Sequence, residues 1–401
     1  MSKWQYDSPR RRHRRALVIL LLLLVGAGAG LYMRHNQPKP KTEAVKKSAP
    51  AVQPTDVTGK YLFSGTAYWA RAIETQAHGN YAQPFSQLST FHPEQYDGWQ
   101  IDLECPVTND VVPYADQVTL LKFNCLPQFL PYATKYFNLI NLANNHTDND
   151  NGIVGLTKTR EALSKIPGVQ YFGTFDPAVT GDDCEVVGLP IHIQMSNGNS
   201  KKGNLPIAFC EWHYVYRLPR PGEIETEQKF AKVMPVFGFV HMGREYIPKA
   251  DPVQVSIAHQ VIDSGAQFVI ANQSHWVQNT EVYKNKLIVY STGNLIFDQL
   301  DAETNRGDNI AVSLSVKDDA NIEKWLKLGP TCVTFKDDCF AKAQAEGLKN
   351  FQVSLDYHVV ASHGGDRELT HLADPATQAA VEQRMNWSQT CQELKAPYGC
   401  N

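Results

Sequence analysis

The feature that most constrains the fold of this chain is a series of short apolar runs, each followed at once by polar side chains. The polar residues that follow these runs are Thr66, Glu104, Asn145, His146, His241, Gln273 and His275. Apolar runs separated by helix-like segments predict buried strands that alternate with helices. Because ligands of open α/β sheets bind outside the carboxyl ends of the strands, we expect these side chains to gather at one site.

The segment Asn141–Thr147 shows this pattern most clearly. Its sequence, Asn-Leu-Ala-Asn-Asn-His-Thr, follows an apolar run that contains Phe137 and Ile140. An amide oxygen and an imidazole at a strand end suit a divalent metal or a phosphate-like anion. The alternative is a polar loop whose Asn side chains cap the next helix. The segment alone does not decide between these two interpretations.

The predicted strands are concentrated in the middle of the chain. They cover residues 61–66, 99–104, 170–173, 184–195, 205–216, 233–241, 268–271, 287–290 and 351–361. Helices are predicted over residues 129–136, 153–165, 252–264 and 375–387. Asp251-Pro252 is typical of a helix start and Gly265 of a helix end. The predicted fold class is α/β, with a mixed sheet or a two-sheet sandwich and outer helices.

The first 50 residues differ in composition from the rest. Residues 1–15 form a basic segment, and residues 16–33 are uncharged and mostly apolar, as a single transmembrane helix requires. Basic segments stay in the cytoplasm, so we expect a single-pass cell-membrane protein with its N-terminus inside and its globular part outside. A secreted protein is the alternative, because Ala27-Gly28-Ala29 resembles a signal-peptide cleavage site.

Three further regions follow the predicted anchor. Residues 34–57 are rich in Lys, Pro, Ala, Gln and Thr and predict a flexible linker. A globular domain is predicted over residues 58–345, and residues 346–401 form a cysteine-bearing C-terminal extension. The eight cysteines show no CxxC pattern, so disulfides are favoured in an exported chain. Connectivity is open, but pairing neighbours (105–125, 184–210, 332–339 and 391–400) closes loops most easily.

Charge and short motifs exclude several function classes. The net charge is −3 with both signs distributed throughout, which gives no reason to expect a nucleic-acid partner. The chain has no Gly-x-Ser-x-Gly segment and no Walker A sequence, so a serine hydrolase of that type and P-loop ATP-driven ligation are not expected.

Four of the polar strand-end residues form a plausible ligand set for a divalent metal. They are one carboxylate, one amide and two imidazoles: Glu104, Asn145, His241 and His275. The structural alternatives are a surface turn for Glu104 and a hydrogen-bonded core imidazole for His241.

Several segments in this order resemble the CapA capsule-synthesis family. They are Leu142–His146, Val240–Tyr246 and Tyr290–Asp298, and the resemblance, which runs from about Tyr61 to Gln299, includes Asp102-Leu103-Glu104 and Gln273-Ser274-His275. Proteins of this family are associated with poly-γ-glutamate production. Their fold is similar to that of calcineurin-like metallophosphoesterases, so the resemblance implies a two-sheet αββα sandwich.

The resemblance also implies roles for individual residues. Glu104 matches the family's candidate bridging carboxylate, Asn145 its amide ligand and His241 a histidine ligand, whereas His146 matches the imidazole that faces the substrate as catalytic acid or base. Two positions depart from the family: Thr66 replaces an Asp, and Gln273 replaces a His. Hydroxyl and amide oxygens bind divalent ions more weakly, so we expect one metal ion (Mn, Zn, Fe or Mg) or none.

The function implied is that of an exported CapA-like protein that helps to synthesise, export or trim an anionic capsule polymer such as poly-γ-glutamate. Its chemistry would be metal-assisted hydrolysis or transfer. The expected partners are this polymer, the membrane and other capsule-synthesis membrane subunits, one of which would supply any ligase. The alternatives are a non-catalytic binding or assembly subunit with a degenerate metal site, and a phosphoesterase.

Overall fold

The computed structural model describes residues 53–147, 152–176, 183–317, 321–334, 336–364 and 369–400. The predicted cytoplasmic segment and the predicted membrane span lie outside the described residues, as does most of the predicted linker. Within the described ranges, no helix combines the length and the apolar character that a membrane span needs.

The strands form one mixed hydrogen-bonded network in which the long strand β1 (Pro54–Ala67) is shared by two halves. The first half contains β2 (Gly98–Leu103), β3 (Leu139–Asn141) and β4 (Gln170–Phe172), all parallel to the later part of β1. It also contains β12 (Arg306–Lys317), which is antiparallel to β1, and β13 (Ser354–His363), which is antiparallel to β12. Short strands β11 (Asn294–Ile296), β14 (His371–Leu372) and β15 (Tyr398–Cys400) pair with β1 and β13.

The second half begins beside the first residues of β1. It contains β5 (Cys184–Met195), β6 (Ser200–Tyr214), β7 (Val236–Met242), β8 (Ala266–Asn272), β10 (Lys286–Val289) and β9 (Thr280–Tyr283), in that order. Strands β6, β7, β8 and β10 run parallel to one another, whereas β5 and β9 are antiparallel to their neighbours.

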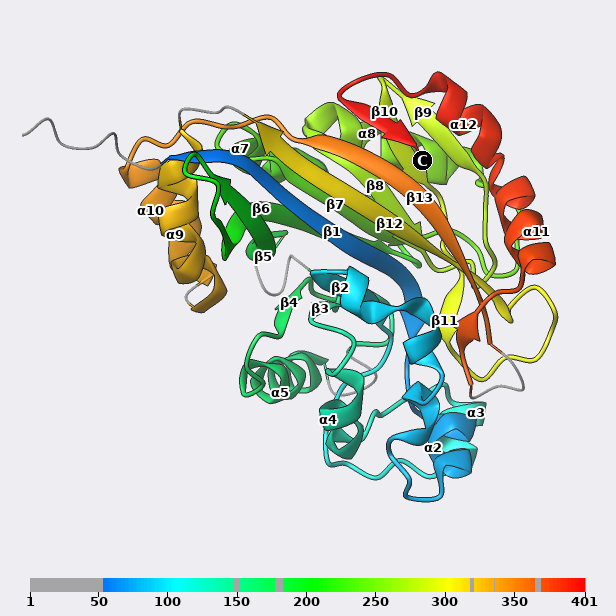
Figure 1. Ribbon diagram of the computed structural model, residues 1–401. Helices are drawn as coiled ribbons and strands as arrows, with labels where there is room; N and C mark the ends of the chain where they lie inside the picture. The colour runs from blue at the N-terminus through cyan, green and yellow to red at the C-terminus, as the bar shows by residue number, and fades with distance from the viewer. Residues whose placement is uncertain are drawn as a thin grey trace, which may run out of the picture. The chain divides into compact units, whose positions relative to one another are not determined.

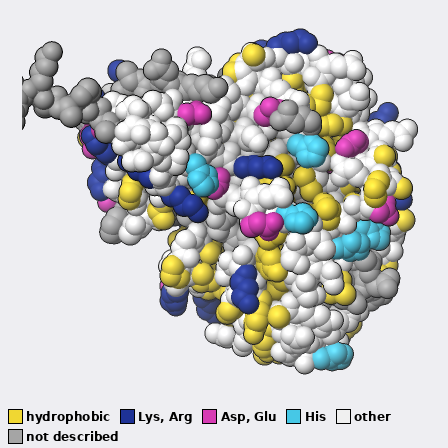
Figure 2. Space-filling view, in the orientation of Figure 1, with side chains coloured by type: hydrophobic (Ala, Val, Ile, Leu, Met, Phe, Trp, Pro, Cys, Tyr) yellow, Lys and Arg dark blue, Asp and Glu magenta, His cyan; other side chains and the backbone are white. Residues whose placement is uncertain are grey.

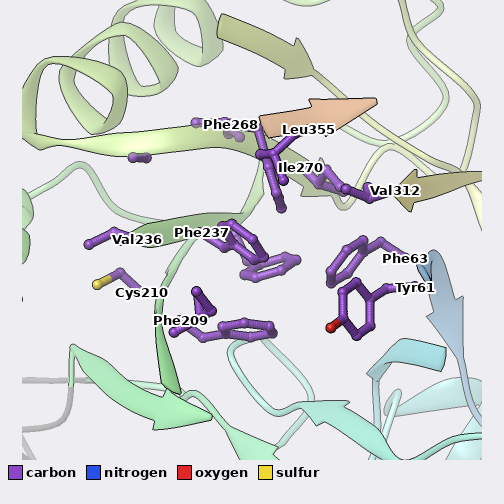
Figure 3. Close-up of a cluster of buried hydrophobic side chains, with 14 of the residues drawn as sticks. Tyr61, Phe63, Phe209, Cys210, Val236, Phe237, Phe268, Ile270, Val312 and Leu355 are labelled. Atoms are coloured by element: carbon purple, nitrogen blue, oxygen red, sulfur yellow. The ribbon is translucent and has the colours of Figure 1, made fainter. Parts of the chain in front are cut away.

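The two halves face each other across an aromatic core (Figure 3). Phe63 of β1 packs on Phe209 of β6, Phe237 of β7 and Phe268 of β8, with ring centroids 5.7 to 6.3 Å apart. Successive residues of a strand point to opposite faces, so Leu62 belongs to a second apolar cluster on the other face of β1. Large buried rings such as these contribute most of the apolar area of a core.

Helices cover the outer side of each half (Figure 1). On the first half these are α2 (Arg71–Ala77), α3 (Tyr114–Thr119), α4 (Leu130–Ala133) and α5 (Gly152–Ser164). On the second half these are α7 (Glu227–Ala231), α8 (Pro252–Ser264), α9 (Ile322–Thr334), α10 (Lys336–Ala345) and α12 (Trp387–Glu393). Helix α11 (Pro375–Met385) packs on β12 and β13 of the first half. The α/β class with a mixed sheet is therefore confirmed.

The predicted elements agree with the structure where local signals are strong. Helix α8 has the predicted bounds: Asp251 accepts hydrogen bonds from the N–H groups of residues 253 and 254, and Gly265 ends the helix at a φ of +134°. The helix predicted over residues 129–136 is shorter, because a 3₁₀ turn over Pro127–Phe129 precedes the four residues of α4. Strand β12 and helices α9 and α10 were not predicted.

All four disulfides join neighbouring cysteines, so the favoured pairing is confirmed. They are Cys105–Cys125, Cys184–Cys210, Cys332–Cys339 and Cys391–Cys400. Cys184 and Cys210 lie directly opposite each other on β5 and β6. Cys105 follows Glu104, so its disulfide fixes the segment that leaves β2.

Candidate functional site

The predicted polar residues lie at the carboxyl ends of strands from both halves of the sheet. Thr66, Glu104, Asn145 and His146 belong to or follow β1, β2 and β3, and His241, Gln273 and His275 belong to or follow β7 and β8. Because the strands within each group are parallel, their carboxyl ends meet at the same edge.

His241 brings the two halves into contact. Its Nε2 atom lies 2.9 Å from Asn145 Oδ1 and 3.6 Å from Glu104 Oε1, both of which come from the first half. His241 and Glu104 are each about 1% exposed. The sequence prediction that these three side chains share one site therefore matches the geometry of the structure.

Asp102 orients the imidazole of His241. Its Oδ2 atom lies 2.7 Å from His241 Nδ1, and its Oδ1 atom accepts a hydrogen bond of 3.0 Å from Asn144 Nδ2. Asn144 also donates to the carbonyl of Leu103, so it fixes the turn after β3. A carboxylate on one ring nitrogen, with the other nitrogen directed into a site, is the arrangement that orients metal-binding histidines. Asp102 was not predicted as a site residue, although it lies two residues before Glu104 and so on the same face of the strand.

The buried charges of this cluster stabilise one another. Burial disfavours the imidazolium form of His241, but Asp102 and Glu104 outweigh burial and raise its pKa to about 10. Burial also disfavours the Glu104 carboxylate, but the hydrogen bond from His241 and the charges of His275 and His146 lower its pKa to about 2. Without a metal ion, His241 therefore donates from both ring nitrogens, one proton to Asp102 and the other to Asn145. A metal ion bound at Nε2 would replace the second of these protons.

His275 is held in a similar way by Asn294. The Nδ1 atom of His275 lies 2.8 Å from Asn294 Oδ1, and Asn294 Nδ2 donates to Gln299 Oε1. Both Gln273 and His275 adopt positive φ angles, +107° and +55°, which are unfavourable for residues with a Cβ atom. Strained turns of this kind are kept where a site needs a side chain in a fixed position.

Three buried acceptors at these strand ends have no hydrogen-bond partner within the described ranges: Thr66 Oγ1, Glu104 Oε2 and Gln273 Oε1. Buried acceptors without a donor cost free energy, and a cation would supply the missing partner. Among the described residues, no three or more His, Cys, Asp or Glu side chains are grouped so that they could hold a metal ion. An ion bound beside Glu104 and His241 would therefore need amide or hydroxyl oxygens, such as that of Asn145, as further ligands.

His146 lies at the rim of this cluster. Its ring is 4.3 Å from that of Phe123 between centroids, and its backbone N–H donates to Asn144 Oδ1. The side chain is partly exposed, unlike those of Glu104 and His241. A molecule that approaches the buried residues from this rim would therefore meet the imidazole of His146.

A family model described as "Bacterial capsule synthesis protein PGA_cap" matches residues 60–189 and 223–299, just over half of the chain. The chain belongs to this family. The matched segments of this PGA_cap protein contain every predicted site residue, and they include Asp102.

Two curated relatives match a short part of the chain. A capsule biosynthesis protein CapA of Bacillus anthracis is 41% identical over 59 residues, which are 15% of this chain and 14% of that protein. A PGA biosynthesis protein CapA of Bacillus subtilis (strain 168) is 36% identical over 59 residues, 15% of this chain and 16% of that protein. The chain thus matches less than a fifth of the length of either relative.

Two solved structures are similar to parts of this PGA_cap protein. TT1561 of Thermus thermophilus has a TM-score of 0.35 and 8% identity, and the match covers 63% of this chain and 93% of that one. Vps29 of Chaetomium thermophilum has a TM-score of 0.19 and 14% identity, over 56% and 82% of the two chains. Both scores are below 0.5, so the fold assignment rests on the strands and helices described above.

His213 is a site neighbour that the sequence prediction missed. It lies opposite His241 in the register of β6 and β7, outside the segments that match PGA_cap. Neither ring nitrogen has a hydrogen-bond partner among the described residues. Burial, with the nearby charges of His241 and Arg217, lowers the pKa of His213 to about 3, so its imidazole is neutral. A signal was present, because His213 also follows an apolar run.

Proposed function

We propose that this protein trims or transfers an anionic, poly-γ-glutamate-like capsule polymer by metal-assisted attack on its amide bonds. The observation that carries the proposal is the contact of His241 Nε2 with Asn145 and Glu104 while Asp102 holds Nδ1. Membership of a capsule-synthesis family supports the substrate class. Within this proposal, the two facing halves with outer helices correspond to the αββα sandwich of calcineurin-like metallophosphoesterases.

The chain offers a ligand for each role that this chemistry needs. Glu104, Asn145 and His241 would hold one divalent ion, with weaker contributions from Thr66 and Gln273. His275 would join this ligand set on metal binding, because the described residues contain no group of three His, Cys, Asp or Glu side chains that could already hold a metal ion. When bound, such an ion polarises a carbonyl group and lowers the pKa of a water molecule. The chain's own residues prepare the site, because Asp102 and Asn294 fix the two imidazoles and Asn144 fixes the turn that carries Asn145.

His146 would move the proton in this reaction. Water adds to the amide carbonyl carbon and gives a proton to a ring nitrogen of His146, which lies at the partly exposed rim. The C–N bond then breaks, and His146 passes the same proton to the departing nitrogen. The products are a carboxylic acid and an amine, and the imidazole is neutral again for the next turnover.

We also propose that residues 16–33 anchor the protein in the cell membrane, with residues 34–57 as a linker and the globular part outside. A secreted form is the alternative to this anchor. The four disulfides support an oxidising compartment. Synthesis of the polymer would then depend on other membrane subunits that carry the ligase.

The test is made on the full chain purified in detergent. Metal content is measured by plasma emission, and chain shortening is measured on poly-γ-glutamate and on a generic phosphodiester. We expect one divalent ion per chain, shortening of the polyglutamate, and loss of that activity in His146→Ala with the metal retained. Protein that holds no metal and shortens no polymer would contradict the proposal, and cleavage of the phosphodiester alone would assign a phosphoesterase.

A non-catalytic binding or assembly role is the second candidate, and Thr66 and Gln273 favour it. Both side chains are buried at the site, yet neither adds a charge or an imidazole. Under the catalytic proposal, the double variant Thr66→Asp with Gln273→His should bind Mn²⁺ tighter by about tenfold or more, because a carboxylate and an imidazole replace weaker ligands. Unchanged affinity would mean that these two positions do not line the metal site.

A further inference from the structure

Arg71, the first residue of α2, is a partly buried cation whose hydrogen bonds leave part of its guanidinium group unused. Its Nε atom donates to the Tyr68 hydroxyl at 2.6 Å, and its Nη2 atom pairs with Asp298. Asp298 is itself held by the Tyr68 hydroxyl and by the N–H group of Ala72. Nη1 has no hydrogen-bond partner in the part of the chain that the structure describes, and the side chain is 14% exposed.

Three aromatic rings surround this guanidinium group. Its central carbon lies 4.7 Å from the ring centre of Phe123, 5.2 Å from that of Tyr68 and 5.4 Å from that of Phe297. Arg71 also has a φ of +48°, a conformation that costs free energy for a residue with a Cβ atom. The chain thus fixes this guanidinium group at a cost, in one orientation, between ring faces that favour its charge.

The same rings form the wall of the candidate site. Phe123 packs against His146, with ring centroids 4.3 Å apart, and Phe297 packs against His275 at 4.8 Å. Arg71 is therefore one ring away from the imidazole that would protonate the leaving group and one ring away from a candidate metal ligand. The match to the PGA_cap family includes Arg71, but nothing in the proposed chemistry uses it.

The face of the molecule shown in Figure 2 does not supply an alternative basic surface for charge recognition. On the face shown in Figure 2, Lys and Arg side chains lie in separate groups among acidic and uncharged ones. The net charge of the chain is −3. A polyanion therefore meets no continuous basic area on that face, and its recognition there depends on individual cations held at the site.

We propose that Arg71 binds a backbone-proximal carboxylate of the polymer, next to the amide bond that is cut. In a γ-linked glutamate chain, the α-carboxylate is attached to the carbon that bears the amide nitrogen, so charge and scissile bond are a fixed, short distance apart. Nη1 would donate to this carboxylate while Nη2 and Nε stay engaged with Asp298 and Tyr68. Arg71 thereby selects a polymer with a free carboxylate on each residue, an inference that rests on the function proposed above.

The test compares a γ-linked glutamate oligomer with its α-methyl ester, which has the same amide bonds and no carboxylate charge. Full-length wild type and Arg71→Lys are assayed for kcat and KM on both, and binding to metal-free protein is measured by titration calorimetry. For the free acid we expect Arg71→Lys to weaken binding and raise KM about 10- to 100-fold, with kcat little changed. For the ester we expect the two proteins to behave alike.

Arg384→Lys is the matched control. Arg384 also pairs with a carboxylate, that of Glu303, with 2.7 Å between Nη2 and Oε2, but among the described residues it packs on no ring of the site. Arg384→Lys should leave the binding and the KM of both oligomers unchanged. Thermal melting should show that wild type, Arg71→Lys and Arg384→Lys are all folded.

The possible failures are distinguishable. If Arg71→Lys weakens binding of the free acid and of the ester equally, or weakens binding of neither, Arg71 is not a carboxylate site. The proposed function still stands in that case, as long as the wild type shortens the free acid. If the wild type cuts neither oligomer but binds the acid in an Arg71-dependent way, the carboxylate site stands without catalysis. If the wild type binds no oligomer, or binds only a phosphodiester, both proposals are overturned.

Discussion

His241 connects the two halves of the sheet, and Asp102 determines which of its nitrogens faces the site. The carboxylate holds Nδ1, so Nε2 is directed toward Asn145 and Glu104. In Asp102→Asn this anchor loses its charge, and the ring is free to reorient. We expect affinity for Mn²⁺ or Zn²⁺ to fall about 10- to 100-fold, measured by titration calorimetry, with an unchanged circular dichroism spectrum.

Asp97→Asn is the matched control for this prediction. Asp97 also contacts an imidazole, with Oδ1 2.8 Å from His192 Nε2, but it precedes β2, whereas the site lies at the other end of that strand. Its metal affinity should equal that of the wild type. An equal loss in both variants, or none in Asp102→Asn, would show that the contact with His241 does not orient a metal ligand.

Asp308 makes stability depend on pH. The side chain is buried, and burial raises its pKa well above the ordinary value. The backbone N–H of Asn309 opposes this shift, whereas the charge of Glu382 adds to it. A group whose folded pKa is raised contributes stability that is complete below its unfolded pKa of about 4, and this contribution is lost as the pH rises through the folded pKa. Protonated Asp308 is thus the form that folding favours.

Asp308→Asn, which keeps the shape and removes the titration, should therefore be more stable than wild type at pH 8, by about 1 to 3 kcal/mol, and similar to it near pH 4. Urea unfolding at both pH values measures the difference. Asp110→Asn is expected to change stability in the opposite direction, so this variant should be less stable than wild type at pH 8. Hydrogen bonds from Thr108 and Lys158 lower the pKa of exposed Asp110, so its carboxylate form stabilises the fold. A constant difference between Asp308→Asn and wild type at both pH values would contradict the assignment.

At the scale of elements, the Cys105–Cys125 disulfide holds the segment that follows β2. Cys125 also donates its N–H to the carbonyl of Pro106, so the bond and the backbone fix the same place. The double variant Cys105→Ser, Cys125→Ser should lose about 3 kcal/mol of unfolding free energy, because a loop with a sequence separation of 20 is no longer closed in the unfolded chain. It should also bind metal more weakly, because Glu104 is adjacent.

The Cys391→Ser, Cys400→Ser double variant separates these two effects. Its disulfide closes a shorter loop beside β15, on a segment that carries no candidate ligand. Chemical denaturation should show a comparable loss of stability, with metal affinity unchanged. Equal metal affinity in both double variants would mean that the disulfide at Cys105 stabilises the fold without positioning Glu104.

Elements with local signals could be predicted, and those that depend on packing could not. Helix α8 is specified by its own ends, Asp251 and Gly265. Helix α9 contains Gly329 and Pro330, both of which argue against a helix. The structure explains Gly329, because a Cβ atom there would lie 2.0 Å from the carbonyl oxygen of Asn204 on β6. Only the close packing of α9 on that strand reveals why this helix needs a glycine.

At the scale of the whole molecule, convergence of the strand ends was predictable, whereas the supporting residues were not. Parallel strands end at the same edge, so Glu104, Asn145 and His241 could be grouped from the order of apolar runs alone. His213 joins them only through the register of β6 with β7, and Arg71 only through the packing of rings from distant segments. The apolar run before His213 is a local signal, but neither the pairing of β6 with β7 nor the packing of the rings can be read from local sequence.

Strands β13 and β15, which follow residue 345, are part of the main sheet and do not form a separate extension. Strand β13 pairs with β12 at ten positions, from Arg306 opposite His363 to Ser315 opposite Ser354, and β13 contributes buried Leu355, Tyr357 and Val359 to the main core. A chain that ends after residue 345 would expose both the edge of β12 and the part of the apolar core that these side chains cover.

We therefore expect the chain that ends after residue 345 to aggregate on expression. A chain that ends after residue 386 keeps β13 and α11, so it should stay soluble with a lower Tm, because it loses α12 and β15 and the hydrogen bond between Thr280 and Thr390. Size-exclusion chromatography and thermal melting compare the two with the full chain. A soluble 345-residue chain with the Tm of the full protein would mean that the first half of the sheet is stable without its outer strands, and that the site needs only the residues from β1 to β12.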